Sequence, residues 1–237
     1  MRNRKVLLGC VPLAALLMFS SSSFLFAAGT EEARKAGWEE GTPGRWKSLP
    51  ERNVAAGDDF FRAEVALSPG TGVLWEKRIK RDLLPEDSLS IEMVSKGINR
   101  TSLDYRQYEA RFPLSVTVVF GEDSMDLPWK KQVGNFFREI WHGFSPGGIR
   151  LTFAYGNETP VNSMYRLEEE ETVFILGGEE ERGKRIKRSR KIKEDFRAAF
   201  GREPRGPVTR ILVSAIRPSR EDGQVEVEIR LSSPLLR

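Results

Sequence analysis

The sequence predicts a mainly β protein: a single two-layer β-sandwich with two inserted α-helices, following an N-terminal signal peptide. About eight segments have the alternating or β-branched pattern of strands, and two others repeat apolar residues at helical spacing. The helical segments lie between strands and do not alternate with each of them, which favours long-range antiparallel pairing over a βαβ array.

Residues 1–29 have the layout of a secretory signal peptide. Three basic residues come first, an apolar run follows, and Ala27-Ala28-Gly29 offers small side chains for cleavage. We therefore expect a periplasmic or secreted protein. The alternative is an inner-membrane anchor formed by the uncleaved segment, which is long enough to span a bilayer. Cys10 follows too short an apolar stretch for a lipoprotein signal.

Removing this segment changes the charge of the protein. It holds 3 of the 38 basic residues and none of the 34 acidic ones, which leaves 35 against 34, a net charge of about +1. That balance does not provide the basic field of a nucleic-acid-binding protein. Cys10 is the single cysteine, so residues 30–237 have neither disulfides nor thiol chemistry.

The remaining chain divides into a polar lead-in and one domain. Residues 30–58 are rich in Gly and Pro, and we predict a loosely ordered lead-in that Trp38 and Trp46 pin to the domain, or else a flexible linker. Residues 59–237 are predicted to form the β-sandwich. Its predicted strands cover residues 60–67, 73–79, 88–94, 114–120, 151–155, 172–176, 208–216 and 225–231.

Two of these segments organise the prediction. The run from Leu114 to Phe120 is β-branched and apolar on both faces, which places it in the centre of a sheet. The stretch from Arg150 to Gly178 reads as two extended segments around a polar loop, the pattern expected of paired strands.

Two helices are expected between the strands. Residues 126–144 repeat large apolar residues every three or four positions, with Pro128 near the start and Gly143 near the end. The second begins near Glu181 or Lys184, has a strongly basic middle, and ends before Gly201.

Four segments in this order resemble an exported bacterial family labelled domain of unknown function 3047. They are ARFPLSVTVVF (110–120), RLTFAYGNETP (150–160), TVFILGGEEERGK (172–184) and EDFRAAFGREPRGPVTRILVSAI (194–216). The resemblance implies an exported protein whose fold is a jelly-roll-like, galactose-binding-like sandwich. It implies no particular activity.

We predict no catalytic or metal-binding residues and no cofactor. His142 is the only histidine, and it lies at the end of a predicted helix, where it stabilises the helix terminus. An enzyme of this composition would have to use carboxylates as acid and base. The candidates are Asp104, Glu109, Glu158 and the run Glu168 to Glu171, which also fits a solvated turn.

Ligand binding is predicted instead at Tyr155, Asn157, Asn162 and Tyr165. A tyrosine at a strand end and amides in the adjoining loop can stack on and hydrogen-bond a sugar ring. Core packing of the tyrosines and turn formation by the asparagines are the alternative explanation.

The sequence therefore predicts a non-catalytic binding or envelope-associated module, with carbohydrate as a partner. The alternative is a carboxylate-dependent hydrolase or lyase acting on envelope polysaccharide. A second partner class is anionic lipid or an acidic protein, bound through a basic helix at Lys184–Lys193. A solvated helix face neutralised by flanking acids is the simpler explanation of that run.

Overall fold

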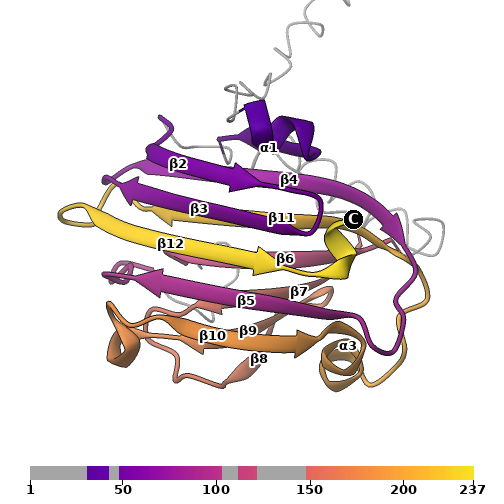
Figure 1. Ribbon diagram of the computed structural model, residues 1–237. Helices are drawn as coiled ribbons and strands as arrows, with labels where there is room; N and C mark the ends of the chain where they lie inside the picture. Colours follow the sequence, from indigo (N-terminus) through magenta and orange to yellow (C-terminus); the bar gives the residue numbers. More distant parts are fainter. Residues whose placement is uncertain (1–30, 43–47, 103–111, 122–147) are drawn as a thin grey trace, which may run out of the picture.

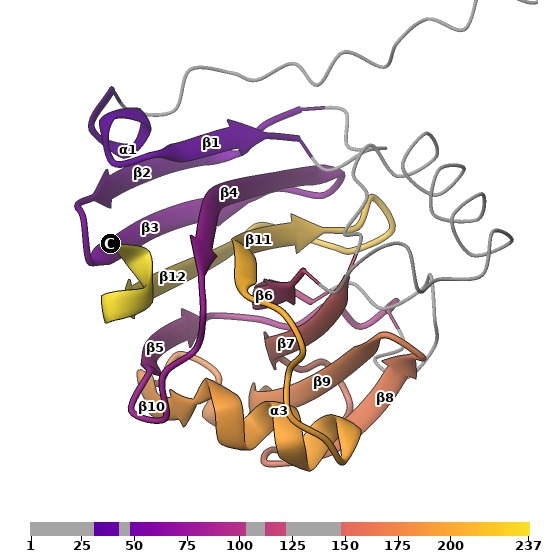
Figure 2. The ribbon, with the colours of Figure 1, turned by 90° about the vertical axis from the view of Figure 1, so that its right-hand side faces the viewer.

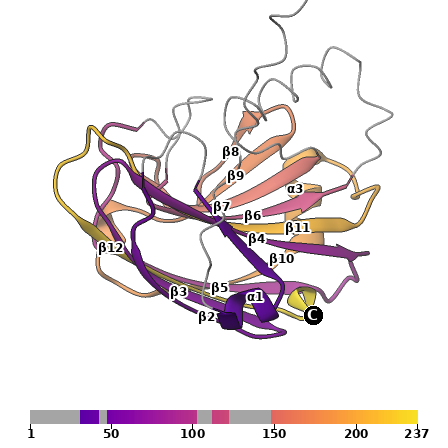
Figure 3. The same cartoon turned by 90° about the horizontal axis from the view of Figure 1, so that it is seen from above.

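The computed structural model describes residues 31–42, 48–102, 112–121 and 148–237. These residues form twelve strands in two sheets that pack face to face, which confirms the predicted mainly β sandwich (Figure 1). Figure 3 shows the two layers from above. The strands are β1 (Trp38–Gly41), β2 (Glu51–Ala56), β3 (Phe60–Leu67), β4 (Thr71–Arg81), β5 (Ser88–Ser95), β6 (Leu114–Phe120), β7 (Ile149–Tyr155), β8 (Met164–Glu168), β9 (Glu171–Gly177), β10 (Ile186–Lys191), β11 (Val208–Arg217) and β12 (Val225–Ser232). The helical elements are α1 (Glu31–Lys35), α3 (Ile192–Phe200) and the 3-10 turns η2 (Glu179–Glu181) and η3 (Pro234–Leu236).

The two sheets differ in size and are both mostly antiparallel. The seven-stranded sheet has the order β1-β4-β11-β6-β7-β9-β8, and the five-stranded sheet has the order β10-β5-β12-β3-β2. The predicted central strand β6 lies between β11 and β7, as its apolar faces require. In both sheets some neighbouring strands come from distant parts of the chain, such as β4 beside β11 and β3 beside β12, so long-range pairing helps to hold the domain together.

The core lies between the sheets and contains aromatic clusters at two places. At the first, Phe61 of β3 packs between Trp38 and Trp75, with ring centroids 4.2 and 5.4 Å away. At the second, Phe196 of α3 meets the Phe120 ring edge-on at 4.6 Å. All five rings are almost completely buried, and rings of this size contribute much of the core's apolar area.

The two extended segments predicted to pair within residues 150–178 are neighbouring strands in the structure, but they run parallel. Strands β7 and β9 are adjacent and parallel, so the chain must cross back between them. The intervening residues include β8, a strand that the sequence analysis missed, which pairs antiparallel with the outer edge of β9. No residue of β8 is buried, so the strand lacks the alternation that identifies one with a buried face.

The stretch expected to be a loose lead-in contributes one strand to each sheet. β1 pairs with β4 in the large sheet, and β2 pairs with β3 in the small one. Glu40 of β1 accepts hydrogen bonds from Trp75 Nε1 (2.8 Å) and Arg52 Nε (2.7 Å). Because Trp75 and Glu40 are both buried, residues 31–42 and 48–58 are an integral part of the sandwich. Trp46 lies outside the described residues.

The predicted basic helix at Lys184–Lys193 is wrong over most of its length. Residues 186–191 form β10, which pairs antiparallel with β5 at the edge of the five-stranded sheet. The helix α3 begins only at Ile192 and ends at Phe200. Gly201 caps it with a φ of 69°, in agreement with the helix end predicted at this glycine. Figure 2 shows α3 following β10 along this side of the sandwich.

Two predicted segments lie outside the described residues: the signal peptide, residues 1–29, and the helix expected over residues 126–144, with its His142. In the part of the chain that is described, no helix is long and apolar enough to cross a membrane.

Candidate functional site: an open groove on the five-stranded sheet

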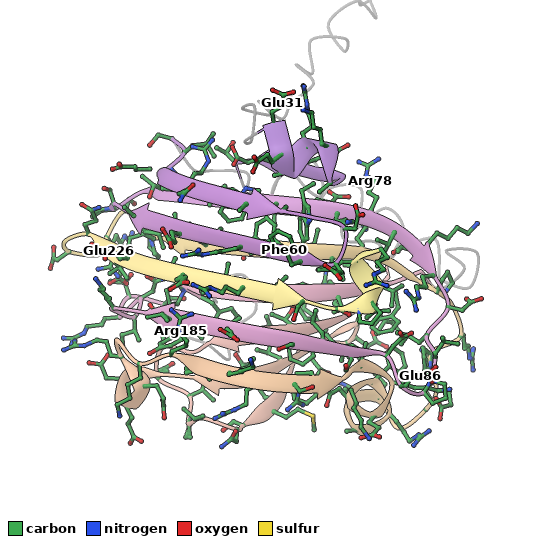
Figure 4. All side chains as sticks on the ribbon, viewed as in Figure 1. Glu31, Phe60, Arg78, Glu86, Arg185 and Glu226 are labelled. Atoms are coloured by element: carbon green, nitrogen blue, oxygen red, sulfur yellow. The ribbon has the colours of Figure 1, made fainter. Side chains whose placement is uncertain are left out.

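The candidate site lies on the outer face of the five-stranded sheet, which faces the viewer in Figures 1 and 4. Buried and outward-facing side chains alternate along its strands, and most of the outward-facing residues are polar. On β12, Val227, Ile229 and Leu231 point into the core, while Glu228 and Arg230 point out. The sequence pattern alone therefore creates a polar outer face.

The register of three neighbouring strands arranges these outward side chains in two rows. In one row Arg62 of β3 lies opposite Arg230 of β12, and Arg230 lies opposite Glu92 of β5. In the next row Phe60 lies opposite Ser232, and Ser232 lies opposite Ser90. An open depression with a volume of about 280 Å³ follows these rows. We call it the serine groove; its lining residues are Phe60, Phe61, Arg62, Ser90, Glu92, Arg230, Leu231 and Ser232.

The groove exists because serine side chains are short. Ser90 and Ser232 leave a trough between longer neighbours, and Ser189 of β10 lies opposite Ser90 and continues the row toward the sheet edge. Among the described residues, the hydroxyls of these three serines have no hydrogen-bond partner. Each hydroxyl can donate one hydrogen bond and accept two, so the floor of the groove presents hydrogen-bonding groups that the described protein groups do not use.

Phe60 forms one end of the groove and is unusually exposed for a phenylalanine, at 43% (Figure 4). The ring does not hang free, because it lies against the backbone of Gly57 in the turn between β2 and β3. A Cβ atom at Gly57 would fall 2.4 Å from the ring. Gly57 N also donates to Phe60 O at 3.0 Å. The ring is therefore an exposed apolar surface with a fixed backing.

Charged side chains border the other side of the groove in a continuous ladder. Glu228 accepts hydrogen bonds from Arg230 Nε and Arg185 Nη2, both at 2.8 Å. Glu92 forms ion pairs with Lys187 (2.9 Å) and Arg185 (3.5 Å). The bond from Lys187 lowers the pKa of Glu92. Burial would raise the pKa of Glu228, but the bonds from Arg185 and Arg230 outweigh it and lower that pKa too. Both carboxylates are held in the charged form.

Tyr155, predicted to bind a ligand, lies in the core between the sheets and is completely buried. Its hydroxyl has no hydrogen-bond partner among the described residues. Burial raises its pKa, and the nearby acids Glu181 and Glu179 add to the effect. Gly177 lies so close that a Cβ there would be 3.0 Å from the ring. These contacts correspond to the packing role that the sequence analysis held as the alternative for Tyr155.

The other three predicted residues do not join Tyr155 in one surface. Asn157 is buried, and its Oδ1 accepts a hydrogen bond from Asn99 N at 2.8 Å, which ties the loop after β7 to the loop after β5. Asn162 is exposed in a turn with φ of 65°, a conformation that asparagine tolerates. Tyr165 packs with Val173 and Ile175 on the outer face of the seven-stranded sheet, away from the core that holds Tyr155.

The candidate catalytic carboxylates are also distributed. Asp104 and Glu109 lie outside the described residues, and Glu158 is exposed in a loop. Glu168 and Glu171 face each other across the turn between β8 and β9, and both bind Arg150 Nη2, at 2.7 and 3.0 Å. The guanidinium occupies the position between the two carboxylates that a scissile bond would need. This pair is an ion-pair cluster that closes a hairpin.

The basic run is largely neutralised by its own surroundings. Arg190 on β10 donates to both carboxylate oxygens of Asp195 (2.9 and 2.5 Å), and its guanidinium lies 4.9 Å from the centre of the Phe174 ring. Lys191 pairs with Glu194 at 2.9 Å, and Lys193 lies 3.8 Å from Glu203. A docking surface for anionic lipid would need these charges free. The run instead forms an edge strand whose exposed lysines discourage pairing with other chains.

The described residues define a mainly β, two-sheet sandwich protein. Within that class the chain belongs to the family described as "Protein of unknown function (DUF3047)", whose model matches residues 93–217. The family match agrees with the motifs that carry the sequence resemblance. It extends from the end of β5 to the end of β11, so Phe60, Arg62 and Arg230 lie outside it.

A comparison with solved structures found the catalytic domain of Humicola grisea Cel12A in complex with a soaked thio cellotetraose. It has a TM-score of 0.44 and 11% sequence identity, and the alignment covers 88% of this chain and 94% of that chain. A comparison with curated proteins found no match.

The groove residues escaped sequence analysis for a specific reason. The alternation along each strand shows that Phe60, Ser90 and Arg230 point away from the hydrophobic core. It does not show that β3, β5 and β12 are neighbours, nor in which register they pair. One local signal was available: an outward phenylalanine at the start of FFRAEVAL is unusual on a solvated strand face.

Proposed function

We propose that this protein is a non-catalytic carbohydrate-binding module and that the serine groove is its binding site. One observation carries the proposal: an exposed aromatic ring and a row of unpartnered hydroxyls lie side by side on a rigid sheet face. A sugar presents an apolar ring face and a rim of hydroxyls. Phe60 supplies the surface for stacking, and the serines supply the hydrogen bonds.

The carboxylate beside the groove supports binding and not catalysis. A general acid in a glycosidase needs a raised pKa so that it is protonated at working pH. Glu92 has the opposite environment, since its bond to Lys187 and its pairing with Arg185 lower its pKa. A charged Glu92 can accept a hydrogen bond from a sugar hydroxyl, but it cannot protonate a leaving group.

Binding is tested with a glycan array and isothermal titration calorimetry, using the protein expressed from its full coding sequence. Phe60→Ala should weaken affinity for the bound glycan about tenfold, the effect of losing roughly 1.4 kcal/mol of stacking and burial. Leu84→Ala is the matched control, because Leu84 is 45% exposed, close to the 43% of Phe60, and lies in the connection between β4 and β5. It should bind as wild type does.

A second variant tests the groove itself. Ser90→Val keeps a strand-forming residue but fills the trough and removes one hydroxyl, so affinity should again fall about tenfold while stability is unchanged. If no glycan is enriched, or if Phe60→Ala and Ser90→Val bind as tightly as Leu84→Ala, the proposed function is wrong.

We further propose that the module is exported and works in the periplasm or outside the cell. The composition of residues 1–29 supports this location. Amino-terminal sequencing of the protein recovered from cell fractions tests it: a chain starting near residue 30 in the periplasm or medium is the expected result. An intact chain in the membrane fraction would support the anchored alternative, and an intact chain in the cytosol would exclude both.

A further inference from the structure

The two arginines beside the serine groove form a like-charge pair on adjacent strands. Arg62 and Arg230 are directly opposite each other in the β3–β12 register and face outward on the same side. Like charges in this relation destabilise a sheet unless a counterion lies between them. Glu228 forms an ion pair with both arginines. Arg230 Nε lies within hydrogen-bond distance of Glu228 Oε1, at 2.8 Å, whereas Arg62 Nε lies 3.6 Å from the same oxygen.

The charges of the ladder do not balance. Its cations are Arg62, Arg185, Lys187 and Arg230, and its anions are Glu64, Glu92 and Glu228, so four positive charges meet three negative ones. The ladder therefore carries one more positive charge than its own carboxylates neutralise.

One guanidinium of the ladder is accessible from the groove. The side chain of Arg230 is 41% exposed and lines the groove. Its Nε donates to Glu228, while its two terminal nitrogens have no hydrogen-bond partner among the described residues. Terminal guanidinium nitrogens form a planar fork that matches the two oxygens of a carboxylate.

We propose that Arg230, with Arg62 beside it, binds the carboxylate of an acidic sugar, so that the ligand of the serine groove is a polysaccharide containing hexuronic acid. This inference rests on the proposed function and adds the class of saccharide. The Phe60 row and the arginine row are two residues apart along the strands, about 7 Å. A sugar ring stacked on Phe60 can bridge that distance with its carboxylate.

The test compares each acidic polymer with its own neutral form. Polygalacturonate, alginate and hyaluronan are each prepared in native and carboxyl-reduced form, and affinities are measured by calorimetry at low and high salt. Wild type should bind at least one native polymer about tenfold more tightly than its reduced form, as a charge-assisted hydrogen-bonded pair provides. High salt should narrow the difference, because the site is partly exposed.

Arg230→Gln should abolish the preference for the native polymer over its reduced form. Arg78→Gln is the matched control: it removes the same charge from a 71% exposed side chain on β4 of the other sheet. It should keep the preference. Arg62→Gln provides a second reading in case Arg230→Gln unfolds, and it should reduce the preference in the same direction.

The outcomes separate the two proposals. If Phe60→Ala weakens glycan binding but wild type binds no native polymer better than its reduced form, the acidic-sugar inference is wrong and the groove still binds carbohydrate. The inference is equally wrong if Arg230→Gln and Arg62→Gln keep the full preference. If Phe60→Ala has no effect on any glycan, the proposed function fails, and the inference fails with it.

Discussion

The outer faces of the two sheets are built by the same alternation of side chains. Polar groups bind one another on the face of the seven-stranded sheet, whereas several are exposed to solvent on the face of the five-stranded sheet. On the seven-stranded sheet, Thr152 donates to Glu171 at 2.7 Å and lies 2.9 Å from the hydroxyl of Thr117. Arg150 completes this cluster, and the whole set is mostly buried. On the five-stranded sheet, the serines and the guanidinium fork of Arg230 lie open.

The difference shows how to tell a structural polar cluster from a binding surface. A buried cluster must satisfy its own donors and acceptors, because water is not there to do so. A binding surface must keep some of them free for a ligand. By this criterion Arg150, Glu168 and Glu171 form a structural cluster, although the two glutamates were candidate catalytic acids in the sequence. The serine groove, whose hydroxyls have no protein partner among the described residues, is the functional candidate.

The largest expected effect is on stability, from the same substitution made on each face. Arg150→Gln leaves Glu168 and Glu171 buried together without their cation, which should cost about 3–5 kcal/mol of unfolding free energy. Arg230→Gln removes a half-exposed arginine and should cost less than about 1 kcal/mol. Equilibrium urea denaturation measures both.

A double variant checks the cause. Adding Glu168→Gln to Arg150→Gln removes one of the stranded charges, so it should recover part of the lost stability. If Arg150→Gln and Arg230→Gln lowered the free energy of unfolding equally, the two arginines would not differ in structural role, and the contrast between the two faces would be wrong.

A smaller effect is expected for hydroxyl groups. Thr152→Val removes a hydrogen bond to a charged acceptor and leaves Thr117 without its partner, at a cost of about 2 kcal/mol. Ser90→Val removes a hydroxyl that has no partner among the described residues, and valine favours strands, so stability should stay within about 0.5 kcal/mol of wild type. If Ser90→Val lowered the free energy of unfolding more than Thr152→Val did, Ser90 would have a structural role.

The smallest effect is a pH response confined to the ladder. The pKa of Glu228 is lowered below its ordinary value of 4.5, so the stability it contributes is present above that pH and is lost as the pH falls through the folded-state pKa. Glu228→Gln should therefore show a shallower loss of unfolding free energy between about pH 6 and pH 3 than wild type.

Asp195 provides the opposite sign. Burial raises the pKa of Asp195 and outweighs the effect of Arg190, so this residue favours the folded state as it becomes protonated. Asp195→Asn should make the acid loss steeper. A shallower acid loss for Asp195→Asn would contradict the raised pKa of Asp195.

Strands with one buried face could be predicted from the sequence. In β5, Leu89, Ile91 and Met93 alternate with polar residues, and the prediction of residues 88–94 is within one residue of the observed strand. In β6, a continuous apolar run indicated a central position, which the structure confirms.

The strands that could not be predicted are at sheet edges. β10 reads IKRSRK, so Ile186 is its single apolar residue and the strand carries no apolar alternation that would distinguish it from a helix. Pairing with β5 decides in favour of a strand, and that pairing is a long-range event. β8 escaped for the same reason.

The candidate site was less predictable than the fold. Tyr155 and Tyr165 are near each other in sequence, but their side chains lie on opposite faces of the seven-stranded sheet. Phe60 and Arg230 are far apart in sequence and are brought together only by the register of β3 and β12. Local patterns identify which side chains leave the core, whereas strand order decides which of them meet.

The position of the last two strands has a consequence for how the chain is made. β11 lies between β4 and β6, and β12 lies between β3 and β5, so each sheet is completed from its middle by the carboxyl-terminal part of the chain. During synthesis the earlier strands wait without their common neighbour until residue 232 has emerged from the ribosome. Both sheets can therefore be completed only late in synthesis, through contacts between distant parts of the chain, which predicts slow folding.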